Sequence, residues 1–130
     1  MTTGLAAGVA NSLLSAVCSA TNYTAPTAFY VKLHIGDPGS AGASNAAGNT
    51  TRQSTTFAAA SGGSIATSAA VTWTSVSTTE TYTHVSFWSA STAGTFLGSN
   101  ALTASKSVTA GDTFTIASGS LTLALSPIAA

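Results

Sequence analysis

The fold is decided by the segment FYVKLHIGDPG, residues 29–39. Apolar side chains at every second position from Phe29 to Ile35 share one face, and Tyr30, Lys32 and His34 share the other. This period of two predicts a half-buried β-strand. The strand should stop at Gly-Asp-Pro-Gly, because proline lacks the N–H that pairing needs and glycine readily adopts positive φ.

The residues before this strand predict a helix over about Gly4–Ser19. Apolar residues recur at every fourth position from Leu5 to Val17, and Thr2 or Thr3 could cap the first turn. The opposite face is polar but has no charge, so we expect the helix to lie between layers or beneath another subunit. Residues 21–26 form a linker that ends at a proline.

The residues after it predict a surface loop over 39–51 and then a series of short strands separated by Gly/Ser turns. In the segment 64–74, Ala69, Val71 and Trp73 should share one face. In the segment 81–88, aromatic residues on both faces indicate a central strand, with Tyr82 opposite Val85. The further strands expected are 55–58, 95–98, 105–109, 113–116 and 120–125.

These elements predict one mainly β domain over residues 1–130. The expected architecture is an antiparallel β-sandwich or partly closed barrel with one N-terminal α-helix. Residues 1–26 would form the helical leader and linker, and residues 27–130 the β body.

Charge is the unusual feature of the composition. Charged residues make up 5% of the chain, against roughly 25% in typical soluble domains. A surface of small uncharged residues suits a protein packed against copies of itself or against neighbours; the alternative is a low-charge secreted domain. Three cations cannot form a nucleic-acid-binding patch, no apolar run is long enough to span a membrane, and residues 1–4 contain no basic leader of a secretory signal.

The ionisable residues allow a metal site by number alone: His34 and Asp37, with His84 and either Asp112 or Glu80. None of them has the close pairwise spacing of a zinc motif. We therefore predict that both histidines bond to backbone or hydroxyl groups, and that both aspartates accept backbone N–H groups in turns. No catalytic, cofactor-binding or metal-binding residue is assigned.

Enzymatic function is not predicted either, since the chain has neither a G-x-S-x-G elbow nor a phosphate-binding glycine loop. Cys18 falls in the apolar pattern of the helix and is expected to be a buried structural thiol. Trp73, Trp88, Tyr30 and Tyr82 could line a sugar-binding face, but such aromatic residues more often fill a core or a subunit contact.

Five motifs occur in order along the chain: LHIGDPG at 33–39, RQ at 52–53, THVSFW at 83–88, GTFL at 94–97 and KSVTAGDT at 106–113. Together they resemble a family of small structural proteins of tailed bacteriophages, described as tail fibre proteins; similar small β proteins decorate phage heads. Two positions depart from the family pattern. Asn45 is followed by Ala46 where the family has Asn-Glu, and Ser89 replaces an aspartate, so any ionic contact of those acidic groups is lost.

The resemblance implies a non-enzymatic virion component that is assembled in the cytoplasm of the bacterial host. The first expectation is a capsid decoration or minor capsid protein that binds the head shell as a homo-oligomer, with a trimer considered. The alternatives are a tail or tail-fibre protein in contact with the host, and a carbohydrate-binding β module that uses Trp73 or Trp88. The expected partners are copies of the chain and the major capsid or tail proteins, without nucleic acid, membrane, cofactor or metal.

Overall fold

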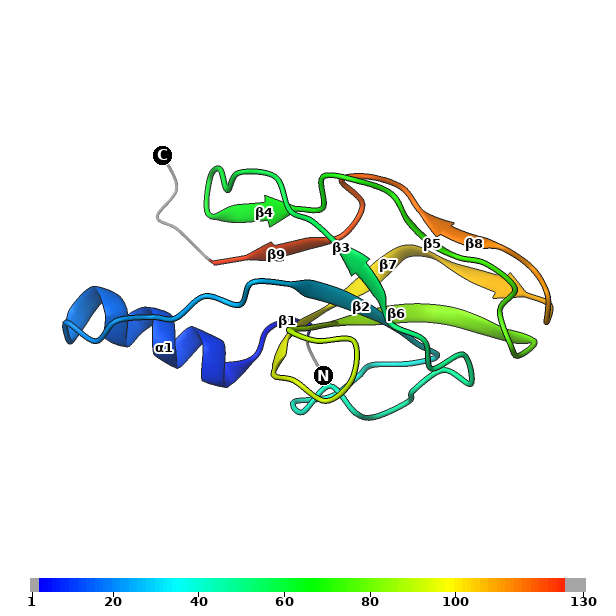
Figure 1. Ribbon diagram of the computed structural model, residues 1–130, viewed down its shortest axis with the longest axis horizontal. Helices are drawn as coiled ribbons and strands as arrows, with labels where there is room; N and C mark the ends of the chain where they lie inside the picture. The colour runs from blue at the N-terminus through cyan, green and yellow to red at the C-terminus, as the bar shows by residue number, and fades with distance from the viewer. Residues whose placement is uncertain (1–2, 126–130) are drawn as a thin grey trace.

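The computed structural model describes residues 3–125, which form one helix and nine strands (Figure 1). The helix is α1 (Ala7–Cys18). The strands are β1 (Gly4–Leu5), β2 (Phe29–His34), β3 (Gln53–Thr55), β4 (Ser64–Ala66), β5 (Val71–Trp73), β6 (Glu80–Trp88), β7 (Phe96–Val108), β8 (Phe114–Ile116) and β9 (Thr122–Ala124).

Five strands form one antiparallel sheet in the order β1-β7-β6-β2-β3. Val31 pairs with Phe87 and Leu33 with Val85, so the apolar face of β2 continues onto β6. The predicted central position of the strand over 81–88 is confirmed, because β6 is the third of the five strands.

Two antiparallel ribbons, β4-β9 and β5-β8, form the second layer and lie over one face of the large sheet (Figure 1). The predicted sandwich is confirmed, and none of the sheets within residues 3–125 closes into a barrel. The strand expected over 64–74 is two strands in different ribbons. The chain turns at the small residues before Val71, where Ala69 is exposed, contrary to expectation, while Val71 and Trp73 are buried as predicted.

The core lies between the two layers and is rich in aromatic residues. The ring of Phe114 lies 5.8 Å from that of Trp73 and 5.1 Å from that of Tyr82, measured between centroids. Tyr82 was expected opposite Val85, but both are buried in the core. The β6–β7 register shifts between Tyr82 and His84, and such a bulge places the side chain on the opposite face.

Strand β2 ends at His34, one residue before the end that the alternation predicts. Ile35 lies outside the strand and is 47% exposed, whereas His34 is fully buried. The following loop folds back against the strand end, because Ile35 N–H bonds to Asn45 O and Ala47 N–H bonds to Leu33 O. The predicted surface loop is mostly exposed. Gly42 is an exception that packs against Phe96: it is buried, and a Cβ added to it would lie 2.4 Å from the Phe96 ring.

The helix begins three residues later than predicted. Gly4 and Leu5 instead pair with Ser99 and Gly98 of β7, and the N-cap is Ala6, without a side-chain cap. Thr3 is therefore not the cap, and Thr2 lies outside the described residues. The pairing requires a glycine, because a Cβ on Gly98 would lie 2.6 Å from the carbonyl oxygen of Gly4.

No residue of α1 is buried, so the helix does not lie between layers of its own chain. It projects from one end of the sandwich together with the linker that returns to β2 (Figure 1). Cys18 is exposed, which corrects the prediction of a buried thiol; it is the last residue of this projecting helix. Over residues 3–125, no helix has the length and apolar character needed to cross a membrane.

Candidate functional site

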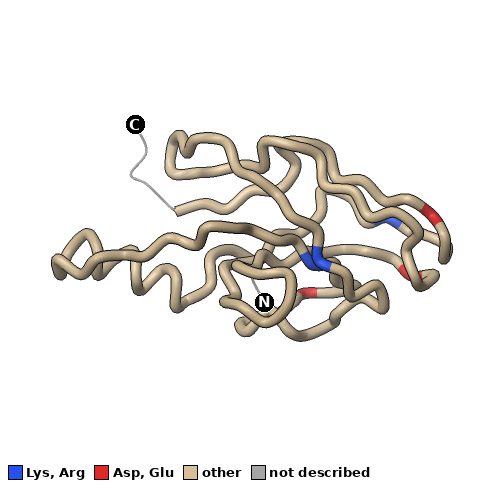
Figure 2. The backbone as a smooth tube through the Cα atoms, in the orientation of Figure 1, with Lys and Arg blue, Asp and Glu red and all other residues tan. Residues whose placement is uncertain are grey.

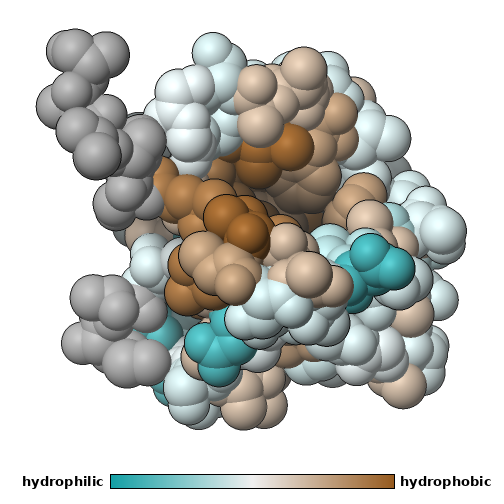
Figure 3. All heavy atoms as spheres, turned by 90° about the vertical axis from the view of Figure 1, so that its left-hand side faces the viewer, coloured by the Kyte–Doolittle hydropathy of each residue, from teal (hydrophilic) through white to brown (hydrophobic). Residues whose placement is uncertain are grey.

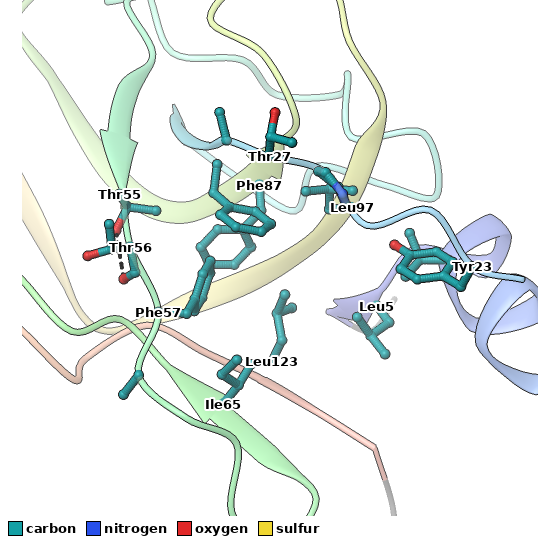
Figure 4. A pocket seen from close by; sticks show the side chains of 15 residues that line it. Leu5, Tyr23, Thr27, Thr55, Thr56, Phe57, Ile65, Phe87, Leu97 and Leu123 are labelled. Atoms are coloured by element: carbon teal, nitrogen blue, oxygen red, sulfur yellow. Dashed lines mark hydrogen bonds between the residues drawn. The ribbon is translucent and has the colours of Figure 1, made fainter. Parts of the chain in front are cut away.

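An apolar hollow of about 520 Å³ opens at the end of the sandwich, where α1 and the linker meet the strands (Figure 4). We call it the end hollow. Its floor includes Phe57, whose ring lies edge-on to Phe29 at 5.4 Å and tilted against Phe87 at 5.7 Å. Further apolar side chains line it from five elements: Leu5, Val9, Ile65, Leu97 and Leu123.

The end hollow exists because the elements around it leave one side uncovered. The linker passes along the rim and contributes Tyr23 and Pro26, while α1 lies outside the sandwich and contributes only Val9. Among the lining residues, Phe29, Phe57, Val9 and Leu123 are therefore only partly buried, although they pack against the core. Only Tyr23 among the lining residues is ionisable, so the hollow suits an apolar side chain better than chemistry on a substrate.

Beyond Val9, which lines the hollow, α1 carries two further exposed apolar side chains. Leu14 is 64% exposed and Val17 is 82% exposed, and the helix has no charged side chain. Figure 3 views this end of the molecule and shows apolar side chains gathered around a hollow. We call α1 together with the end hollow the end face. Exposed apolar residues that gather in this way mark an interaction surface more often than isolated ones do.

The two histidines lie on the face of the large sheet that points away from the ribbons, and both form hydrogen bonds. His34 Nδ1 lies 2.8 Å from Ser44 O, and His34 Nε2 lies 2.8 Å from Ser86 Oγ. His84 Nδ1 lies 2.8 Å from Thr83 Oγ1. The prediction that both histidines bond to backbone or hydroxyl groups is confirmed. Within residues 3–125, no three possible metal ligands come together.

The three carboxylates accept hydrogen bonds from backbone N–H groups. Asp37 Oδ1 accepts the N–H of Gly39 at 2.7 Å, and Asp112 Oδ2 accepts the N–H of Thr109 at 2.8 Å, as predicted for turns. Glu80 holds the long loop, accepting the N–H groups of residues 48 and 49 at 2.9 and 3.2 Å. Sequence reasoning missed this contact, because its partners are more than 30 residues away.

The four aromatic residues considered for a sugar-binding face are divided between the core and the outer face of the large sheet. Trp73 and Tyr82 are 1% and 0% exposed, as expected for core residues. Trp88 is half-buried, with the guanidinium of Arg52 4.1 Å from its ring centroid and the ring of Phe96 5.5 Å away. Arg52 is fixed there, because its Nη1 donates to the carbonyls of Ala90 and Ala93.

Residues 4–124 match the family described as Podophage GP4 fiber I protein gp80. The chain belongs to this family. A comparison with curated proteins finds no match. As a member of the gp80 fiber I family, the chain is a phage structural protein and a virion component, which confirms the coarser part of the resemblance.

A structural member of the gp80 fiber I family functions through surfaces that contact other proteins of the virion. The end face offers one uncharged surface of this kind. The residues singled out for metal chemistry instead stabilise loops and turns of the β body. Sequence reasoning missed the end hollow, since its walls come from segments spread between Leu5 and Leu123.

Proposed function

We propose that this protein is a non-enzymatic fibre component of the virion that associates with copies of itself through the end face. One observation carries the proposal: α1 has no charged side chain and no buried residue, and it adjoins an apolar hollow. A helix that stays in water would normally carry charged residues on its outer surface.

Self-association would remove this apolar surface from water. Covering Leu14 and Val17 would contribute about 1–2 kcal/mol for each side chain, and filling the end hollow would add to this. Helix α1, which we call the arm, lies next to the hollow on one chain, so the arm of one copy can reach the hollow of the next. Closed rings, of which a trimer is one, are produced by such head-to-tail contacts when the rotation closes.

The first test of this association measures mass in solution. Val17→Lys places a charge on the arm, and Thr92→Lys places the same charge on the exposed β6–β7 turn as a matched control. Mass photometry and sedimentation should show that Val17→Lys dissociates the oligomer while Thr92→Lys leaves it assembled, and both variants should keep the circular dichroism spectrum of the folded wild type. Assembly of Val17→Lys at wild-type concentrations would overturn the proposed interface.

The position on the particle is the second part of the proposal. The word fibre in the family description supports a tail or fibre location over the capsid decoration expected first from the sequence. Gold-tagged antibody on intact virions separates the two by electron microscopy. Label on the tail or on projecting fibres would support the proposal, and label spread over the head would replace it with decoration. Absence of label from the particles would overturn both.

A further inference from the structure

Two of the three cations of the chain stand opposite each other on the outer face of the large sheet, away from the ribbons. Val31 pairs with Gln53 at the end of the β2–β3 ladder, and continuing this register by one residue places Lys32 opposite Arg52, close enough for the two charges to interact. Figure 2 shows these two cationic positions close together. Like charges directly across a sheet destabilise it, so the stability of the fold does not explain this pair.

No carboxylate of the described residues compensates the pair. The chain has three acidic residues, and Asp37, Glu80 and Asp112 each bond to backbone N–H groups. Burial lowers the pKa of Lys32, and the nearby charge of Arg52 lowers it further. Burial alone lowers the pKa of Arg52. A carboxylate close to either cation would act in the opposite direction.

The surroundings of the pair favour a protein partner. Arg52 stacks on Trp88 and is held by two carbonyls, and Tyr30 pairs with Trp88 across β2 and β6. Arginine, tryptophan and tyrosine are the residues enriched at the energetic centres of protein interfaces. A sugar ring would need an open aromatic face, but Arg52 and Phe96 already pack against Trp88.

We propose that Lys32 and Arg52, flanked by Tyr30 and Trp88, bind a carboxylate side chain of a different virion protein. The partner is not a second copy of this chain within the described residues, because all three of its carboxylates are engaged in its own turns and loops. An arginine fork beside a lysine point charge matches the geometry of an aspartate or glutamate. The proposal does not depend on self-association through the end face.

The test uses the full chain, labelled with ¹⁵N, and a hexaglutamate peptide as the probe. Binding should shift the indole N–H signal of Trp88 and the amides around Lys32, whereas hexaglutamine should not. Lys32→Gln should weaken the affinity about fivefold or more, since it removes one of the two charges. Lys106→Gln makes the same change on the other lysine, in β7, and should bind like the wild type. Lys32→Arg should restore binding.

Three results would overturn the proposal. One is the absence of any shift at Trp88 with hexaglutamate, and another is an equal loss of affinity in Lys32→Gln and Lys106→Gln, which would indicate general attraction. The third is binding of an oligogalacturonate without binding of hexaglutamate, which would identify an acidic saccharide site. Lys32 makes no side-chain hydrogen bond within residues 3–125, so Lys32→Gln tests the charge without removing a bond of the fold.

Discussion

His34 Nε2 lies 2.8 Å from the hydroxyl oxygen of Ser86, which is 52 positions away in the sequence. The same oxygen lies 2.7 Å from Nε1 of Trp88, which can only donate. Ser86 therefore accepts from Trp88. Because the Ser44 carbonyl can only accept, His34 carries a proton on Nδ1, and in the neutral ring Nε2 then accepts from the Ser86 hydroxyl.

Replacing Ser86 with alanine should destabilise the protein by about 1–3 kcal/mol, because it leaves Nε2 of the buried His34 and Nε1 of the half-buried Trp88 without this partner. Urea unfolding followed by circular dichroism measures this loss. Ser54→Ala, on the exposed side of β3, is the matched control and should change stability by less than about 0.5 kcal/mol. An equal loss in both variants would show that the network contributes nothing.

Acid should destabilise the protein through His34. Burial is the main cause that lowers its pKa, and the charges of Lys32 and His84 lower it further, whereas backbone bonds to residues 44 and 45 raise it. The folded protein thus binds fewer protons than the unfolded chain below about pH 6.5. The stability that neutral His34 contributes is complete above that pH and is lost as the pH falls toward the folded pKa.

Urea midpoints between pH 7.5 and pH 5 should show this fall in stability. His34→Gln should flatten the dependence on pH, while the control His84→Gln leaves His34 and its contact with Ser86 in place and should keep most of it. If His34→Gln shows the same decline as the wild type, another group must be responsible.

The local elements of this fold were predictable, and the contacts between distant segments were not. Alternation located β2, and the turn chemistry of Asp37 and Asp112 followed from their neighbours in the sequence. The bulge before His84 depends on the register with β7, which no local pattern contains. Without that register, Tyr82 was assigned to the wrong face.

The same limit applies to the sites. The apolar repeat of the helix is present in the sequence, but the exposure of the helix depends on the place where β1 pairs with β7, at Gly98. The pairing of Lys32 with Arg52 follows only from the β2–β3 register. Both candidate surfaces therefore required the tertiary structure.

Removing the hydroxyl of Tyr82 should stabilise the protein. The ring is fully buried, and within residues 3–125 its oxygen makes no hydrogen bond of good geometry, although the side chains of Asn49 and Glu80 lie close enough to affect its pKa. Tyr82→Phe keeps the contact with Phe114 and should raise the free energy of unfolding by about 1 kcal/mol. Tyr30→Phe, on the half-buried outer face, should be nearly neutral. A loss of stability in Tyr82→Phe would indicate a bond that holds this hydroxyl.

Truncating Leu121 should be costly, although it lies outside the strands. The side chain is 0% exposed and belongs to the core cluster. Leu121→Ala should cost about 2–5 kcal/mol in thermal or urea unfolding, since it removes buried contacts and leaves a cavity. Leu125→Ala makes the same change at a side chain that is 53% exposed and should cost less than about 1 kcal/mol. Equal losses would contradict this location of the core.

The attachment of α1 determines which substitutions the chain can accept during evolution. The helix adds no buried residue to the body, and of its side chains only Val9 packs against the core. A substitution at Leu14 or Val17 thus leaves the folding of the sandwich intact and is selected only by what the helix contacts. The outer surface of this segment is free to diverge with its neighbours, while the aromatic interior remains constrained.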